Sequence, residues 1–364
     1  MFWRLDLKCR IHNRLSLDSM ALSHQSANKG LTMITLQIQN RWVPFLKAGV
    51  AALLLSSSSW GNAQTQWPSK AVTLVVPFAP GGGTDIGSRI VAQKLSQLWG
   101  QSVLVDNRGG AGGNLGLEIV SRAKPDGYTL LTGNVGTQSI NPTLYKKLNY
   151  NPDTAFAAIG LFAELPFVMA VTPSLPVNSV KELVALAKAS PDKLTYASSG
   201  NGGSPHLSAE TFKIATGTQI LHIPYKGGGA AMTDLMSGNV HMIFSSVLET
   251  SAQIKAGKLK ALAISSKNRV SALPDVPTLE ESGITGAESG SWLGLLAPAG
   301  TPQPILDKIS QSLQQVLAMP DVQQQLIGQG AVAKGGTTAE FISLIASDRK
   351  RYAKIILDNK LVVD

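Results

Sequence analysis

The sequence predicts an α/β fold of two lobes, in which each lobe is a mostly parallel sheet flanked by helices. Short apolar runs of the kind that form buried strands alternate along the chain with amphipathic helical segments. The alternation starts again after Phe156, and most of the runs end in a turn of Gly, Ser, Asn or Thr. This order favours parallel strands whose connecting helices cover the faces of the sheet.

The first round of alternation begins with the apolar run at residues 73–78, which we expect to be a buried strand. A glycine-rich turn follows, and the apolar residues between 86 and 98 fall on one face of a helix. Further strands are expected at residues 102–105 and 128–131, with a helix that includes residues 117–123 between them. These elements form a βαβαβ unit and therefore a parallel sheet.

The second round has the same character and ends in helices. We expect strands at residues 194–197, 220–223, 240–244 and 259–264. Ser179 with Glu182, and Thr337 with Glu340, have the spacing of capping boxes and predict two helix starts. Asp348 interrupts the apolar face of the last helix, so we expect it near the rim of that helix.

Two longer apolar stretches, at residues 158–171 and 290–297, are interpreted as the places where the chain crosses between lobes. Two crossings make the first lobe discontinuous. We therefore predict a first lobe of residues 64–165 plus 290–364, and a second lobe of residues 166–289.

Residues 1–63 are predicted to be a leader that contains a signal peptide. A basic residue, Arg41, precedes the apolar run at residues 48–55, and small residues then lead to a cleavage site near Ala63. The apolar run is shorter than the roughly 20 residues that a membrane-spanning helix needs. This pattern predicts cleavage after export and a periplasmic protein.

The charge and the cysteine content exclude several classes of function. The chain has a formal net charge of +9, to which the seven basic and two acidic residues of the predicted leader contribute +5, leaving +4 for the rest. This mild excess has no dense basic run, so it predicts an anionic ligand rather than a nucleic acid. Cys9 is the only cysteine and lies in the leader. We therefore expect no disulfide, no Cys-ligated metal and no thiol nucleophile. No cluster of His, Asp and Glu has the spacing of a metal site, so we expect no metal, and we also expect no cofactor.

Three glycine-rich loops, at residues 77–85, 198–207 and 224–230, follow predicted strands and lead into helices. Loops of this kind gather at one edge of a parallel sheet, where open α/β folds bind ligands. Backbone N–H groups beside glycines and the N-terminus of a helix favour an anion, although a tight strand-to-helix turn explains the same glycines.

A fourth glycine-rich loop, at residues 107–116, fails the spacing of a dinucleotide-binding fingerprint. Counted from Gly110, the third glycine position holds Leu115, and counted from Gly112, the second holds Asn114. We interpret this loop as a close-packed turn and expect no nicotinamide cofactor.

An enzymatic constellation is also missing from the sequence. Ser204 and His206 are near each other, but neither loop serine lies in Gly-x-Ser-x-Gly, and a pair two residues apart seldom forms a catalytic triad. His222 and His241 lie in apolar strands and are expected to be satisfied core histidines. We predict a protein that is not an enzyme, with a secreted hydrolase or a periplasmic interaction protein without a transport role as the alternatives.

Residues 67–364 resemble the periplasmic receptors of the Bug family, the substrate-binding components of tripartite tricarboxylate transporters. The first loop, for example, reads Val-Pro-Phe-Ala-Pro-Gly-Gly-Gly-Thr-Asp. The runs that carry the resemblance, in order, lie at residues 67–68, 76–85, 105–113, 124–130, 196–207, 224–227 and 273–278. Each run is weakly specific alone, but together they cover nearly the whole chain after the leader.

The resemblance implies a two-lobe periplasmic-binding-protein clamshell that closes on a small organic anion, such as a carboxylate, a dicarboxylate or an aromatic acid. It also implies a membrane partner, either a permease or a sensor kinase. By position in the matching motifs, the expected ligand-binding residues are Phe78, Ala79, Gly81, Gly82, Asp85, Asn134, Thr137, Ser199, Asn201, Ser204, His206, Tyr225 and Gly227.

Two of these residues have other interpretations. The Asp85 carboxylate would repel a dicarboxylate but could hold the amine of an amino acid. We favour a structural role for Asp85, in which its charge stabilises the start of a helix. His206 could instead pin its loop at the start of the following helix.

Overall fold

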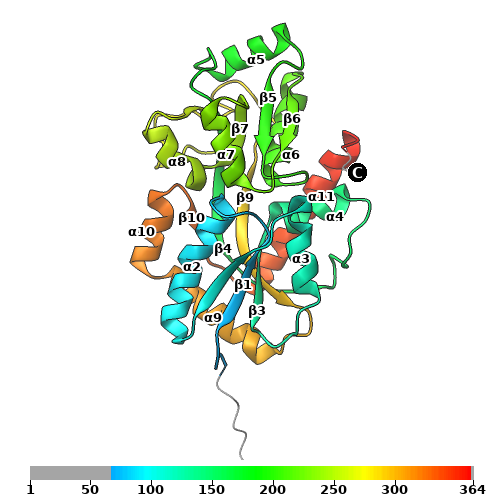
Figure 1. Ribbon diagram of the computed structural model, residues 1–364, viewed down its shortest axis with the longest axis vertical. Coiled ribbons are helices and arrows are strands. Elements are labelled where there is room, and N and C mark those ends of the chain that lie inside the picture. The colour runs from blue at the N-terminus through cyan, green and yellow to red at the C-terminus, as the bar shows by residue number, and fades with distance from the viewer. Residues whose placement is uncertain (1–66, 362–364) are drawn as a thin grey trace, which may run out of the picture. The chain divides into compact units, whose positions relative to one another are not determined.

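The computed structural model describes residues 67–361, so the predicted leader and the cleavage site near Ala63 lie outside the described residues. The described part is an α/β fold of two lobes (Figure 1). No helix among these residues is both long and apolar enough to cross a membrane.

The strands are β1 (Val72–Val76), β2 (Val103–Asn107), β3 (Thr129–Asn134), β4 (Phe156–Val171), β5 (Thr195–Ser198), β6 (Leu221–Pro224), β7 (Met242–Ser246), β8 (Lys260–Ile264), β9 (Gly290–Pro298) and β10 (Val332–Ala333). Seven strands lie close to the predicted positions, two more (β4 and β9) occupy the stretches that we expected to cross between lobes, and the short β10 was not predicted. The helices are α2 (Gly83–Trp99), α3 (Asn114–Ser121), α4 (Asn141–Leu144), α5 (Val180–Ala189), α6 (Ser204–Thr216), α7 (Gly228–Ser237), α8 (Val247–Lys255), α9 (Gln303–Leu317), α10 (Pro320–Gly328) and α11 (Thr338–Asp358), with short helical turns η2 (Ala111–Gly113) and η3 (Gly136–Ile140).

The first lobe has a parallel centre. Strand β1 lies between β2 and β3 and pairs in parallel with both. Its adjacent side chains Leu74 and Val75, which point to opposite faces of the sheet, are both buried, because helices cover a parallel sheet on both faces. The strand ends at Val76, earlier than predicted, since Pro77 has no N–H to donate to a neighbouring strand.

The second lobe repeats this plan. Strand β5 lies between β6 and β7 and pairs in parallel with both. Antiparallel pairs extend both parallel centres. In the first lobe, β9 is antiparallel to β3 and β4, and in the second lobe, β7 and β8 are antiparallel to β4. The sheets are therefore mixed, with the parallel strands placed where the glycine-rich loops begin.

Strand β4 takes part in both lobes. Residues 156–166 pair with β9, and residues 167–171 pair with β7 and β8. The two apolar stretches that we expected to cross between lobes coincide with β4 and β9 (Figure 1). The change of partner follows Pro166, and the lobe limits predicted from the sequence remain a prediction.

The predicted helix caps differ in detail. At α11, the Thr337 side chain accepts the N–H of Glu340 and the Glu340 carboxylate accepts the N–H of Thr337, which completes the capping box. At α5, Ser179 accepts the N–H of Glu182 at 3.2 Å, but the Glu182 carboxylate accepts the N–H of Asn178 at 2.7 Å. The return hydrogen bond of the predicted box is therefore made by the N–H of Asn178, one residue before the N-cap Ser179.

The half-buried Asp348 of α11 accepts a hydrogen bond from the indole N–H of Trp292 at 2.8 Å. Burial raises the pKa of this carboxyl group, against the opposing effect of the Trp292 hydrogen bond. The polar residue that interrupts the apolar face of α11 thus joins that helix to β9.

Candidate functional site

Loops from the two lobes are in direct contact. The Ala79 N–H donates to the carbonyl of Lys226 at 3.3 Å, and the Tyr145 hydroxyl donates to the carbonyl of Asn201 at 2.8 Å. The Gly83 N–H, at the start of α2, is 3.4 Å from the Glu249 carboxylate on α8. The glycine-rich loops predicted to face each other therefore meet in this structure.

Glycines make this approach possible because a side chain would collide with the opposite loop. A Cβ atom at Gly229 would lie 2.6 Å from the Pro80 carbonyl oxygen, and one at Gly227 would lie 2.9 Å from the Ala79 nitrogen. At Gly112, which has a φ of +62°, a Cβ would lie 2.1 Å from the Asn201 carbonyl oxygen. Such distances are too short for any residue larger than glycine, so these positions set how closely the loops approach.

A cavity of about 40 Å³ lies among these loops. Five predicted site residues line it, namely Phe78, Gly82, Asn134, Ser199 and Ser204. A space of this size accommodates a few water molecules or one carboxylate group. A ligand with a longer body would require the loops to separate further.

Four helices begin at this cavity. The lining includes the first residues of α2, α6 and α7, which are Gly83, Ser204 and Gly228, and the N-cap of α8, which is Ser246. The N-terminus of a helix carries partial positive charge and free N–H groups, which favour an anion. The described lining contains no lysine or arginine, so the attraction for an anion comes from the backbone.

Sequence reasoning missed five polar residues of this lining, which are Thr84, Ser245, Ser246, Glu249 and Ser291. Three of them, Ser245, Ser246 and Glu249, lie at the end of β7 and the start of α8. These three residues could have been found with the rule already applied to the other loops, which is that ligands bind where parallel strands end. The loop after β7 contains no glycine cluster, and the other three loops were identified by their glycines, so this loop was not predicted as part of the site.

Glu249 has an unusual environment for an acidic residue. Its Oε2 accepts hydrogen bonds from the Ser245 hydroxyl at 2.7 Å and from the Gly83 N–H at 3.4 Å. Its Oε1 is shielded from solvent and has no hydrogen-bond partner among the described residues, although the residue as a whole is only half-buried. Burial raises the pKa of Glu249 to about 7, while the two hydrogen bonds act in the opposite direction.

Asp85 lies behind the first loop and not in the cavity lining. Its side chain, only 3% exposed, accepts hydrogen bonds from the Gly81 N–H at 3.0 Å and the Asn107 amide at 2.9 Å, and it forms an ion pair with Arg89 at 2.9 Å. Burial alone raises the pKa of Asp85, but the hydrogen bonds from Arg89, Gly81 and Asn107 hold it below its ordinary value. This carboxylate therefore fastens the first loop to α2 and β2.

Asn134 is held by a reciprocal pair of hydrogen bonds with Thr137. The Asn134 N–H donates to the Thr137 hydroxyl, and the Thr137 N–H donates to the Asn134 side-chain oxygen, both at 3.0 Å. The Asn134 amide nitrogen is 3.3 Å from the hydroxyl of Thr84, which also lines the cavity. Thr137 thus positions Asn134 from outside the lining.

Other predicted residues lie around the cavity and not in its lining. Tyr225 donates its hydroxyl to Asp234 at 2.6 Å, and Asn201 contributes its carbonyl to Tyr145. Ala79, Gly81 and Gly227 lie where the two glycine loops touch. Their role in ligand binding remains a prediction from the sequence.

His206 lies beneath the loop that carries Ser199 and Ser204. Its Nδ1 accepts the Gly202 N–H at 3.3 Å, and its ring stacks on His222 with centroids 4.3 Å apart. Burial is the main cause that lowers the pKa of His206 to about 4 and that of His222 to about 3. Both rings are therefore neutral near pH 7, and His206 holds the loop in place.

The predicted core histidines have local partners. His222 shares a hydrogen bond of 2.6 Å with the Ser198 hydroxyl, and His241 contacts the N–H and hydroxyl of Thr195 at 3.0 and 2.9 Å. The Ser204 hydroxyl bonds to Ser291 at 3.3 Å rather than to His206. Within residues 67–361, no group of three His, Cys, Asp or Glu residues could hold a metal ion.

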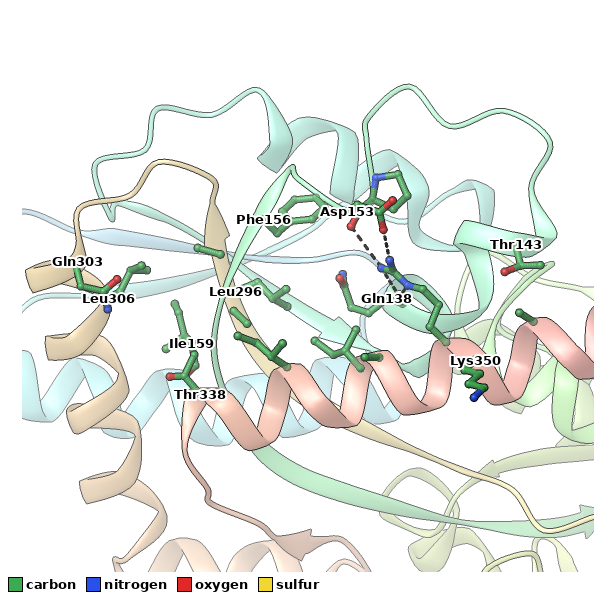
Figure 2. Close-up of a pocket in the computed structure, with 18 of the residues that line it drawn as sticks. Gln138, Thr143, Asp153, Phe156, Ile159, Leu296, Gln303, Leu306, Thr338 and Lys350 are labelled. Atoms are coloured by element: carbon green, nitrogen blue, oxygen red, sulfur yellow. Dashed lines mark hydrogen bonds and ion pairs between the residues drawn. The ribbon is translucent and has the colours of Figure 1, made fainter.

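A larger hollow of about 1000 Å³ lies along α11, and Figure 2 shows Gln138, Ile159 and Leu296 around it. Arg349 of α11 pairs with Asp153 at its edge. The lining contains none of the predicted site residues and comes from the predicted first lobe alone. We place the candidate site in the smaller cavity, because that cavity lies where parallel strands of both lobes end.

Comparison with known proteins identifies similar sequences. Residues 88–361 match the family described as the tripartite tricarboxylate transporter family receptor. A relative from Agrobacterium vitis, the UPF0065 protein in the TAR-I ttuE-ttuC' intergenic region, is 38% identical over 311 residues, which cover 84% of this chain and 90% of the relative. Protein BugT from Bordetella pertussis is 32% identical over 291 residues, covering 80% of this chain and 89% of BugT.

Solved structures show the same fold. The periplasmic binding protein BugD has a TM-score of 0.79 and 38% identity, covering 81% of this chain and 99% of BugD. Rpa4515 from R. palustris with adipate has a TM-score of 0.78 and 35% identity, over 80% of this chain and 97% of that one. MatC from Rhodopseudomonas palustris with bound malate has a TM-score of 0.77 and 31% identity, over 80% of this chain and 100% of MatC.

Proposed function

This chain belongs to the family of tripartite tricarboxylate transporter receptors, and from this premise we propose that it captures a small organic carboxylate between its two lobes. The observation that carries the proposal is the cavity at which four helices begin and two lobes meet. Helix N-termini, backbone N–H groups and serine hydroxyls are donors for a carboxylate, and they need no charged side chain.

The chemical class of the ligand follows from the same features. Adipate and malate, found in two of the similar structures, are both dicarboxylates. We infer that this receptor takes a ligand of the same class, with one carboxylate in the cavity. The rest of the molecule would lie between the loops at residues 77–85 and 198–207, which separate to admit it.

The mechanism that we propose is ligand-dependent closure. The described residues of the two predicted lobes move as two bodies, with the hinge near Pro166 in β4 and near the start of β9. A ligand favours the closed form only by its extra affinity for that form. A membrane permease or a sensor kinase then recognises the closed surface.

The proposed receptor is exported to the periplasm and does not catalyse a reaction on its ligand. The similar proteins are periplasmic receptors, and the predicted signal peptide with cleavage near Ala63 supports the same compartment for this chain. Ser204 and His206 bind other partners, which supports a receptor rather than a hydrolase.

A thermal-shift screen tests this function. The exported protein is unfolded, freed of bound ligand, refolded and heated with mono-, di- and tricarboxylates, aromatic acids and acidic amino acids. A ligand at a hundred times its Kd stabilises the folded state by about 2.7 kcal/mol, which raises the midpoint by a few degrees in a protein of this size. If none of the acids raises the midpoint of the refolded protein, the proposed function is wrong.

A further inference from the structure

Two polar atoms in the cavity lining lack hydrogen-bond partners within the described chain. They are Glu249 Oε1 and Ser246 Oγ, and the Ser246 residue is only 3% exposed. A buried polar group without a hydrogen-bond partner destabilises the folded state, because it has lost its hydrogen bonds to water and gained none in return. The two atoms therefore mark a place where a ligand group supplies the missing hydrogen bonds.

The neighbours of these atoms bring them to the same part of the cavity. Glu249 Oε1 lies against α7, since a Cβ at Gly228 would be 2.2 Å from it. Ser246 Oγ lies against α2, since a Cβ at Gly83 would be 2.2 Å from it. A carboxylate between the starts of α2 and α7 would accept hydrogen bonds from the Ser246 hydroxyl and from a protonated Glu249.

Within the described residues, no charged side chain on the surrounding elements forms a hydrogen bond or ion pair with Glu249. The charged groups on these elements are Asp85, Arg89 and Lys94 on α2, Glu164 on β4, His206, Glu210 and Lys213 on α6, Asp234 on α7 and Lys255 on α8. Asp85 pairs with Arg89, and Glu164 pairs with Lys334. None of these groups contributes to the shift that burial causes in the pKa of Glu249, so no cation in the described chain compensates an ionised Glu249.

We propose that Glu249 selects the ligand as a neutral acid, which donates a hydrogen bond from its Oε1 to the ligand carboxylate, so that one proton is bound with each ligand. This inference rests on the proposed function, because it concerns the same cavity. The proton comes from solvent when Glu249 is ionised before binding. No covalent bond forms or breaks apart from the O–H bond of the glutamic acid.

Two consequences follow for selectivity. At high pH, an ionised Glu249 would face the ligand carboxylate with a like charge, so affinity falls as the pH rises through and beyond about 7. With one proton linked to binding, the affinity falls up to tenfold for each pH unit above that range. A ligand that presents an ammonium group to this cavity would show the opposite dependence.

Isothermal titration with malate, adipate and the acid that gives the largest thermal shift tests the proposal between pH 6 and 9. Carboxyl groups with ordinary pKa values are ionised throughout this range, so the ligands do not titrate. Wild type is compared with Glu249→Gln, which keeps a neutral donor, and with Glu164→Gln as a matched control at a half-exposed position outside the cavity lining. We expect a tenfold loss per unit above pH 7–8 in wild type and in E164Q, and an almost constant affinity in E249Q.

A second measurement needs no variant. Heats of binding at pH 8, measured in two buffers of different ionisation enthalpy, give the number of protons taken up, which we expect to approach one. Constant affinity with no proton uptake in wild type would overturn the role of Glu249 and leave the receptor function standing. Loss of binding in E249Q, with wild-type affinity that rises with pH, would overturn it in favour of a cationic ligand group. Failure of wild type to bind any acid at pH 6 would overturn the proposed function, and this inference with it.

Discussion

Two acidic side chains near the cavity, Asp85 and Glu249, show how neighbours decide the charge of a carboxyl group. Asp85 receives hydrogen bonds from Arg89, Gly81 and Asn107, and its pKa is lowered although burial acts against this. Glu249 receives two hydrogen bonds from neutral donors, and burial raises its pKa to about 7. The sequence directed attention to Asp85, because it follows the glycine loop, whereas the structure places Glu249 in the lining.

The stacked histidines give a prediction at the scale of single residues. A histidine whose pKa is lowered by folding stabilises the folded state fully above its unfolded pKa of about 6.5, and this contribution is lost as the pH falls toward the folded pKa. For His206, with a folded pKa of about 4, the loss is on the order of 3 kcal/mol between pH 6.5 and 4.

The variant His206→Gln keeps an acceptor for the Gly202 N–H but cannot take up a proton. We expect its free energy of unfolding to be lower than that of wild type at pH 8, because the ring stack is lost, and to fall less steeply between pH 6.5 and 4. Urea unfolding across this range measures both slopes. Equal slopes in the two proteins would contradict the assignment of a neutral, buried His206.

At the scale of elements, local sequence signals determine where a helix or strand begins, whereas tertiary pairing determines which strands lie side by side. The capping box at Thr337 and Glu340 predicted the start of α11, and the structure has Thr337 as the N-cap of that helix. The apolar run at residues 158–171 predicted a crossing, and it became a single strand that changes partners after Pro166. Apolarity explains why β4 is buried, but it does not specify which strands lie beside it.

The cap of α11 gives a prediction for that helix. Thr337→Ala removes the acceptor for the Glu340 N–H at 3.2 Å and should lower the free energy of unfolding by about 1 kcal/mol. Ser347→Ala, at an exposed position inside the same helix, is the matched control and should change stability by less than about 0.5 kcal/mol. Chemical denaturation compares the variants. An unchanged midpoint for T337A would show that α11 is held by packing alone.

At the scale of the whole molecule, the contact between loops of the two lobes depends on glycines. Gly229 contacts Pro80 across the interface and does not have the positive φ that would make a substitution strained within its own loop. A side chain here therefore obstructs closure and leaves each lobe able to fold.

We expect Gly229→Ala to weaken carboxylate binding at least tenfold while the melting temperature without ligand stays within about 2 °C of wild type. Gly328→Ala is the matched control, since Gly328 lies at the exposed end of α10 with no atom within 4 Å of a built Cβ. Calorimetric binding and melting curves test the pair. Wild-type affinity in G229A would mean that the bound state leaves this interface open.

The sequence by itself determined seven of the strands, the start of α11 and the loops that follow parallel strands, because these features depend on residues close together in the chain. It also predicted five residues of the cavity lining. The tertiary structure decided which loops meet and brought Gly83 to Glu249, 166 residues away. Local periodicity records which face of an element is buried, but not which distant element covers it. The residue that we propose as the selector of the ligand could therefore be found only in the folded chain.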